Sequence, residues 1–265
     1  MTALVLVAHG SRDPRAAAST RALVRAVAAA RPGLDVRAAF LDHTAPTPRA
    51  VLAALAADGC AEAVAVPLLL TEAYHGRVDI PSMLAEVRAA GVPIEVHRAP
   101  VLGPAAGAPV DAALIEALVR RLAEARLRHD ALVLAAAGTR DATARSTVDA
   151  AAAALGTALG VRCLAAYASA AAPTPGDAVR LLRAGGATRV AVASYFLAPG
   201  LLHDRALASA ASAGAVGASA PLGDVPAVAR LVLDRASVAA LTMSATTHRE
   251  VSRRAAVRRP AAQAT

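Results

Sequence analysis

Short apolar runs alternate with longer segments of helical spacing along the first part of the chain. Continuous apolar runs are typical of strands buried on both faces, as in a parallel sheet covered by helices. The predicted strands are Ala3–Ala8, Asp35–Leu41, Ala63–Leu70 and Ile94–His97, and the predicted helices between them are Arg15–Ala30, Thr47–Ala57 and Ile80–Ala90. Gly or Pro follows each of these helices. The alternation predicts an α/β fold with a doubly wound parallel sheet.

The same pattern occurs twice. The segment Ala3–Asp13 reads ALVLVAHGSRD and returns at Ala131–Asp141 as ALVLAAAGTRD, an offset of 128 residues. Two further segments return in the same order at an offset of 127: APTP at 45–48 and 172–175, and an apolar run at 64–70 and 191–197. Ordered matches at nearly one offset indicate two copies of one domain.

The second copy predicts its own sheet. Its predicted strands are Ala131–Ala135, Val161–Tyr167, Arg189–Leu197 and Val216–Ala218, and a long helix over Pro109–Arg128 leads into it. We therefore predict two tandem doubly wound parallel-sheet domains related by internal duplication, at residues 1–128 and 129–243. Residues 244–265 are expected to form a basic, disordered tail.

Composition narrows the class of protein. Of the 265 residues, 56% are hydrophobic, which excludes a disordered chain. Cys60 and Cys163 are the only cysteines and neither belongs to a CxxC pair, so a disulfide scaffold is not expected. The tail contains no Cys, and no iron–sulfur cluster is expected. No apolar run reaches about 18 residues and no secretory signal opens the chain, so we expect a cytoplasmic protein without a membrane span.

The charge points away from nucleic acid. All 28 basic residues are Arg, and the formal net charge is +8. Half of that excess lies in the tail, where five arginines face one glutamate. Aromatic residues make up only 2% of the chain, whereas single-strand binders interleave aromatic and basic side chains. What remains is a modest positive excess, which suits a cleft for a small molecule rich in carboxylates.

Candidate chemistry lies where the predicted strands of the first copy end. His9 follows the first strand, Asp42 and His43 end the second, and His75 follows the third. Ligands of parallel sheets bind at this edge. Imidazole nitrogens and a carboxylate are suitable ligands for Co²⁺, Fe²⁺ or Ni²⁺, and imidazole also accepts protons near neutral pH. Position alone leaves a hydrogen-bonded loop histidine and a metal ligand about equally open.

Other chemistries lack their motifs. The chain has no GxxxxGK[ST] phosphate loop, no GxGxxG after either first strand and no GxSxG nucleophile turn. ATP, a dinucleotide and serine catalysis are therefore not expected. Asp13 and Asp141 stand at helix starts, where capping is their expected role.

The ordered motifs resemble one known family. AHGSR at 8–12, AFLD at 39–42, VPLLL at 66–70 and YHGRVDIP at 74–81 together look like the CbiX/SirB type of class II sirohydrochlorin chelatase, and SYFLAPGLLHDR at 194–205 agrees in the second copy. The resemblance covers about Thr2 to Ala240. It implies two chelatase-like domains that insert a divalent metal, Co²⁺ or Fe²⁺, into sirohydrochlorin without ATP, on the route to cobalamin or sirohaem.

The resemblance also implies residue roles. His9 and His75 correspond to the family's active-site histidines, and we expect both as metal ligands, with His9 the proton acceptor. Asp42 stands where the family more often has Glu and is expected to orient an imidazole or hold the metal through water. The second copy has Ala137 in place of His9, so one half carries the chemistry. The expected substrate contacts are Ser11, Arg12, His43, Leu70, Thr71, Glu72, Ala73, Tyr74, Gly76, Arg77, Arg140, His203 and Arg205.

Two alternatives stay open. A metal or tetrapyrrole carrier would keep the cleft and bind without turnover, although a retained pair of histidines favours an enzyme. A two-lobed solute-binding protein would need an export signal. The duplication can replace a homodimer, so a monomer or weak dimer is expected.

Overall fold

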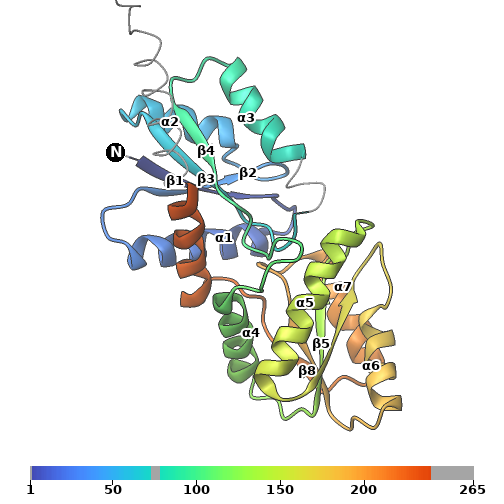
Figure 1. Cartoon of the computed structure of the whole chain (residues 1–265). Coiled ribbons are helices and arrows are strands. Elements are labelled where there is room, and N and C mark those ends of the chain that lie inside the picture. The colour runs from blue at the N-terminus through green and yellow to red at the C-terminus, as the bar shows by residue number, and fades with distance from the viewer. Residues whose placement is uncertain (1, 73–77, 240–265) are drawn as a thin grey trace, which may run out of the picture.

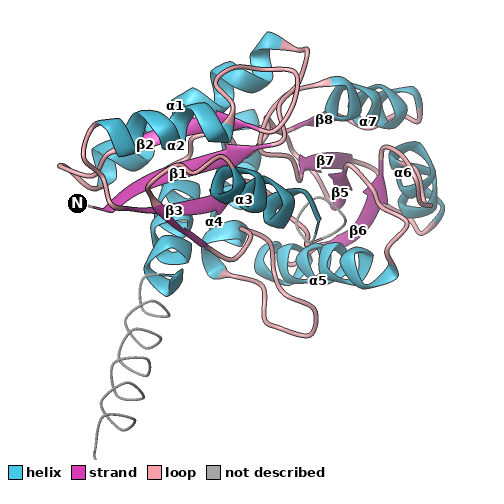
Figure 2. Cartoon of the chain, turned by 90° about the horizontal axis from the view of Figure 1, so that it is seen from above, coloured by secondary structure: helices cyan, strands magenta, loops and turns pink. Residues whose placement is uncertain are grey.

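The computed structural model describes residues 2–72 and 78–239. The first half of the chain forms a parallel sheet of strand order β2-β1-β3-β4 with helices on both faces (Figures 1 and 2). Its strands are β1 (Thr2–Ala8), β2 (Val36–Phe40), β3 (Glu62–Pro67) and β4 (Glu95–Arg98), and its helices are α1 (Pro14–Ala30), α2 (Pro48–Ala57), α3 (Ile80–Ala89) and α4 (Ala112–Ala125).

The second half repeats this arrangement with strand order β6-β5-β7-β8, also parallel. Its elements are β5 (Ala131–Ala136), α5 (Ala142–Leu159), β6 (Arg162–Tyr167), α6 (Pro175–Ala184), β7 (Val190–Ser194), α7 (Leu201–Ser212) and β8 (Gly217–Ala218). The predicted fold class is confirmed. Among the described residues, no helix has both the length and the apolar character that crossing a bilayer requires.

Helix starts follow the side chains that the sequence places there. Asp13 accepts a hydrogen bond from the amide of Arg15 at 2.9 Å, and Asp141 accepts one from Ala144 at 3.1 Å. Thr174 and Asp177 form a reciprocal capping box at the start of α6. The capping role expected for Asp13 and Asp141 is therefore confirmed, because each carboxylate satisfies an amide that has no partner within its helix.

Two strands end earlier than their apolar runs predict. The run at 63–70 was expected to be strand throughout, but β3 ends at Pro67, and β7 ends at Ser194 instead of residue 197. After Pro67 the amide of Leu69 turns back to bond the Pro67 carbonyl at 2.9 Å. Apolarity continues past the strand because these residues stay buried or half-buried in the loop. A buried loop and a buried strand give the same sequence signal.

The two sheets share one apolar core. On β1, Leu4 and Leu6 face this core, and Leu132 and Leu134 of β5 face it from the second sheet. The intervening residues of β1 face a separate core beneath α2 and α3, and those of β5 face another beneath α6 and α7. The period of two along each strand sorts its side chains between a shared inner core and an outer one.

A helical segment at residues 226–239, which is not among the predicted elements, completes the shared core. It lies beside the first sheet, whereas α4 of the first half lies against α5 and β7 of the second (Figure 1). Arg235 fixes this helix to the first half, since its guanidinium donates to the carbonyls of Val101 and Leu102 at 2.9 and 3.3 Å. Each half therefore covers its sheet partly with a helix that the other half of the chain supplies.

The exchanged helix α4 predicts a stability effect. Leu118 lies on α4 with none of its surface exposed. Leu118→Ala is expected to lower the free energy of unfolding by about 3 kcal/mol, because it removes three buried carbon atoms and leaves a cavity. Leu181→Ala is the matched control, since Leu181 on α6 is 56% exposed, and should change it by less than about 0.5 kcal/mol. Urea unfolding of both variants measures the difference, and equal midpoints would contradict the packing of α4.

Candidate active site at the strand ends of the first sheet

His9 is the first residue after β1 and is exposed at the carboxyl end of that strand. Its carbonyl accepts a hydrogen bond from the amide of Asp42 at 2.8 Å. Gly10 has φ +94, and a Cβ there would lie 1.8 Å from the carbonyl oxygen of Asp42. Glycine is therefore required for the loops after β1 and β2 to touch, and their contact brings His9 and Asp42 to one edge of the sheet.

Side chains join the same two loops. The Thr44 hydroxyl donates to the carbonyl of Ser11 at 3.0 Å and accepts from the Ser11 amide at 3.4 Å. Asp42 accepts from the amide of His43 at 2.8 Å, and its second oxygen lies 3.2 Å from Nε2 of the His43 ring. The imidazole that Asp42 contacts is therefore that of His43, which has φ +58 and follows it directly.

His9 and Asp42 line one cavity of about 470 Å³ between the strand ends and helices α2 and α3. Several other polar residues line this cavity and are not among the predicted site residues: Thr47, Arg49, Asp79, Ser82 and Glu86. The last three are spaced three and four residues apart along α3 and its start, so they share one helix face. That spacing beside a strand-end histidine was the signal available in the sequence.

Asp79 differs from the capping aspartates. It precedes α3 in a helical conformation, with φ −69 and ψ −40, and its carboxylate does not cap that helix. Asp79 lines the same cavity as His9. Asp42, Asp79 and Glu86 give this cavity an acidic lining beside the imidazole of His9, and Arg49 supplies one positive charge.

Part of the predicted site lies outside the described residues: Ala73, Tyr74, His75, Gly76 and Arg77. In the parts of the chain that the structure describes, no group of three His, Cys, Asp or Glu side chains is arranged to hold a metal ion. His9 and Asp42 are the two predicted catalytic residues that the structure brings together.

The remaining predicted contacts are spread over the strand-end edge. Arg12, Arg140 and Arg205 are exposed, and Thr71 and Leu70 are half-buried. Glu72 forms an ion pair with Arg98 and lines a different cavity of about 610 Å³, beside the helix at 226–239. In that second cavity Arg235 pairs with Asp111, so its charged side chains pair with one another.

The second half keeps the backbone of the site without its side chains. Gly138 has φ +97, and a Cβ there would lie 1.9 Å from the Ser169 carbonyl, as Gly10 does against Asp42. The amide of Ser169 bonds the carbonyl of Ala137 at 3.0 Å. Ala137, Ser169 and Ala170 thus occupy the places of His9, Asp42 and His43. The loop geometry has been retained and the imidazoles and carboxylate have been lost.

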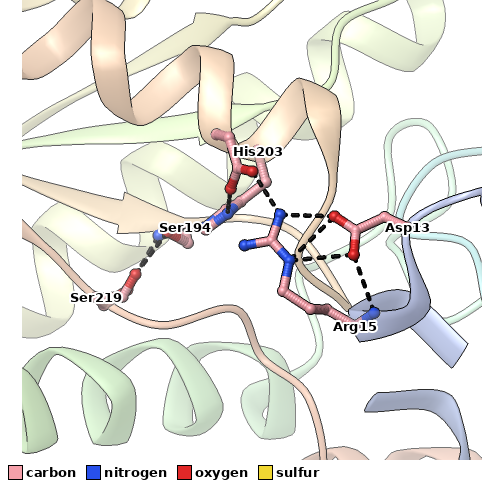
Figure 3. A network of polar contacts seen from close by, with 6 residues as sticks. Asp13, Arg15, Ser194, His203 and Ser219 are labelled. Atoms are coloured by element: carbon pink, nitrogen blue, oxygen red, sulfur yellow. Dashed lines mark hydrogen bonds and ion pairs between the residues drawn. The ribbon is translucent and has the colours of Figure 1, made fainter. Parts of the chain in front are cut away.

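His203 is buried on α7, and its ring contacts residues of the second half. Its ring is buried, with Nε2 3.2 Å from the Ser194 hydroxyl and Nδ1 3.3 Å from Asp204. Asp204 forms an ion pair with Arg15, which also pairs with Asp13 (Figure 3). Both ring nitrogens therefore have hydrogen-bond partners within the protein. Neither is left to make the substrate contact that is expected for His203. Beyond it, the amide of Ser194 donates to Ser219 at 3.1 Å.

The class of protein follows from this geometry: a duplicated α/β protein with a strand-end histidine and a carboxylate in one of its two copies. The sequence profile of the CbiX family matches residues 3–125 and 131–239, so the chain belongs to the CbiX family. No curated protein matches the chain.

Solved structures share the fold over nearly the whole chain. SirB from Bacillus subtilis with Fe³⁺ has a TM-score of 0.77 at 21% identity and covers 92% of this chain and 97% of its own. The sirohydrochlorin chelatase SirB from Bacillus subtilis subspecies spizizenii, in complex with cobalt, has a TM-score of 0.71 at 21% identity, covering 89% and 94%. CbiX, described as the terminal enzyme of sirohaem biosynthesis in denitrifying bacteria, has a TM-score of 0.62 at 23% identity, covering 89% and 99%.

The contact between the two site loops predicts the effect of a glycine substitution. Gly10→Ala is expected to lower the free energy of unfolding by at least about 2 kcal/mol, because the new Cβ meets the Asp42 carbonyl and alanine is strained at this positive φ. Gly33→Ala is the matched control: its φ is +83, but a Cβ there meets nothing within 4 Å. It carries the strain without the clash, so it should cost about 1 kcal/mol. Equal losses in thermal or urea unfolding would show that the loops can separate freely.

The buried imidazole predicts how stability depends on pH. Burial lowers the pKa of His203 below its usual 6.5, although Asp204 acts in the opposite direction. Below pH 6.5 the unfolded chain therefore binds a proton that the folded protein resists, so stability should fall as the pH drops from 7.5 to 5. Arg15 lowers the pKa of Asp13 and of Asp204, so their contributions are lost only at more acidic pH. In urea titrations His203→Gln should flatten this slope, and an unchanged slope would exclude His203 as its source.

Proposed function

We propose that this protein is a sirohydrochlorin chelatase that inserts a divalent metal, Co²⁺ or Fe²⁺, into the tetrapyrrole without ATP. The observation that carries the proposal is the cavity lined by His9 and Asp42 at the strand ends of a CbiX-family sheet. The matching loops of the second half hold Ala137 and Ser169 on the same backbone. Reactive side chains have thus been kept in one copy only.

Metallation replaces two pyrrole N–H protons with one M²⁺, so a proton acceptor and a metal ligand are needed on one face of the macrocycle. His9 is exposed at the edge of the sheet and serves first as a ligand for the incoming metal. Once the metal moves to the pyrrole nitrogens, the freed imidazole nitrogen of His9 accepts a pyrrole proton. His75 is the partner ligand by its place in the family motif. Each pyrrole proton passes to an imidazole or to water, and the nitrogen lone pairs that it leaves bind the metal.

Asp42 contributes charge and position to this reaction. It contacts His43 through both carboxylate oxygens, one at the backbone amide and one at Nε2 of the ring. Together with Asp79 and Glu86 it gives the cavity the oxygen-rich lining that attracts a hydrated divalent cation. We infer that the metal approaches through this cavity and loses its water as it reaches His9.

The two halves of the chain have different roles in this proposal. Residues 1–128 carry the reactive groups, and residues 129–243 supply the opposite wall. Arg12, Arg77, Arg140 and Arg205 are proposed to pair with the peripheral carboxylates of the substrate. Cobalt and iron share ligand preferences, and the related SirB structures hold Fe³⁺ and cobalt. Both metals are therefore proposed as substrates, for a route to cobalamin or to sirohaem.

The catalytic role of His9 gives a direct test. Purified protein mixed anaerobically with sirohydrochlorin and Co²⁺ or Fe²⁺ should accelerate the absorbance change of metallation over the metal-only blank. His9→Ala should lower the rate by about 100-fold or more, because the proton acceptor is lost. His129→Ala, on the connection between α4 and β5, is the matched control and should keep the wild-type rate.

The outcomes separate the candidate functions. Stoichiometric binding of sirohydrochlorin with no acceleration by any divalent metal would identify a carrier and reject the enzyme. If His9→Ala still accelerates metallation, the protein is a chelatase, but the proton acceptor is a residue other than His9. Rates compared between Co²⁺ and Fe²⁺ decide which metal is preferred.

A further inference from the structure

The backbone just beyond β3 is held from within the first half. The carbonyl of Leu69 accepts hydrogen bonds from the amides of Leu102 and Gly103 at 2.9 and 3.1 Å. Gly103 lies so close that a Cβ on it would come within 1.8 Å of the carbonyl oxygen of Leu70. Leu70 precedes His75 by five residues in the sequence.

The second half holds the next carbonyl, that of Leu70, through a tyrosine. Tyr195 directly follows β7, is 3% exposed, and donates its hydroxyl hydrogen to the Leu70 carbonyl at 3.3 Å. These residues are 125 positions apart, so the bond crosses between the two halves. Burial raises the pKa of Tyr195. The phenol therefore remains a donor throughout the neutral range, and a buried hydroxyl of this kind needs its acceptor.

A reciprocal bond holds the equivalent carbonyl of the second half. Leu197 corresponds to Leu70 in the repeat, and its carbonyl accepts from the Ser19 hydroxyl of α1 at 3.2 Å. The amide of Gly223 donates to it at 3.0 Å. Each half thus fixes the loop that leaves the third strand of the other half. Only the loop after Leu70 leads to a histidine that the proposed function uses.

We propose that Tyr195 is a positioning residue for metallation: its hydroxyl fixes the Leu70 carbonyl and thereby sets where the segment carrying His75 leaves the sheet. The half without reactive histidines then contributes to the rate through one hydrogen bond, in addition to forming a wall. The proposal rests on the chelatase function. It predicts an effect on kcat, because misplacing a reacting group by about 1 Å costs up to about 100-fold while binding of the substrate elsewhere is unchanged.

Tyr195→Phe removes this hydroxyl and keeps the ring, so it is the variant to test. It is expected to lower kcat about 10-fold with KM for sirohydrochlorin within twofold of wild type. Tyr167→Phe is the first control: Tyr167 is also 3% exposed, but its hydroxyl bonds Asp149 at 3.2 Å within the second half. Ser19→Ala is the second, because it removes the reciprocal bond. Both controls should keep kcat within twofold.

Thermal unfolding separates positioning from packing. Each tyrosine variant loses the hydrogen bonding of one hydroxyl: that of Tyr195 to the Leu70 carbonyl, and that of Tyr167, which is shared between Asp149 and the Arg145 carbonyl. Both should therefore lower Tm by a similar small amount, about 2–4 °C. A loss of kcat confined to Tyr195→Phe supports positioning. Equal kcat values for the two tyrosine variants would overturn it, as would a Tyr195→Phe defect that appears only in KM.

Amide hydrogen exchange tests the proposal independently of turnover. In Tyr195→Phe the amides of Leu102 and Gly103 should exchange at least about threefold faster than in wild type, because the backbone they bond has lost one anchor. The two controls should leave these rates unchanged. If wild-type protein shows no metallation, the proposed function fails. If exchange at Leu102 and Gly103 is the same in Tyr195→Phe and Tyr167→Phe, the anchoring role of Tyr195 fails whatever the activity.

Discussion

The structure depends on one apolar core that both sheets bury together. Leu4 and Leu6 of β1 and Leu132 and Leu134 of β5 face it from opposite sides, and α4 and the helix at 226–239 complete it. Because each of these two helices covers the sheet of the other half, neither half can bury its inner face alone. This shared core fixes the position of the two halves relative to each other. It is also why the end of β7 reaches the end of β3, where Tyr195 contacts Leu70.

Within that frame, the two copies have diverged in side chains more than in backbone. Gly10 and Gly138 make the same close approach to a neighbouring strand-end carbonyl, and the loops they permit have the same hydrogen bonds. Replacing an imidazole by a methyl group costs such a loop little stability, because the His9 side chain is exposed. The exposed side chain is therefore easily exchanged between the copies, whereas the glycine that shapes the loop is not.

The polar contacts between the halves differ in what they contribute. Arg15 and Asp204 are 54% and 48% exposed, so solvent screens this ion pair and it adds little to stability. Ser194, His203 and Tyr195 are buried, and leaving such groups without partners costs more than the bonds gain. Of these buried groups, Tyr195 joins the two halves through the Leu70 carbonyl and so specifies how they meet, whereas Ser194 and His203 bond within the second half. The exposed Arg15–Asp204 pair (Figure 3) also crosses between the halves.

The sequence by itself determined the duplication, the alternation of strands and helices, the helix caps at Asp13 and Asp141, and the edge at which His9 and Asp42 meet. These follow from local periodicity, from capping chemistry and from the rule that parallel strands end at one side of their sheet. Only the tertiary structure decided that β3 stops at Pro67, that Asp42 contacts His43, that His203 is buried, and that α4 and the helix at 226–239 exchange partners. The exchange of helices depends on contacts between residues far apart in the chain. The end of β3, the Asp42–His43 contact and the burial of His203 depend on the conformation and packing of each loop or helix, and an apolar run or a lone histidine carries the same sequence signal in either environment.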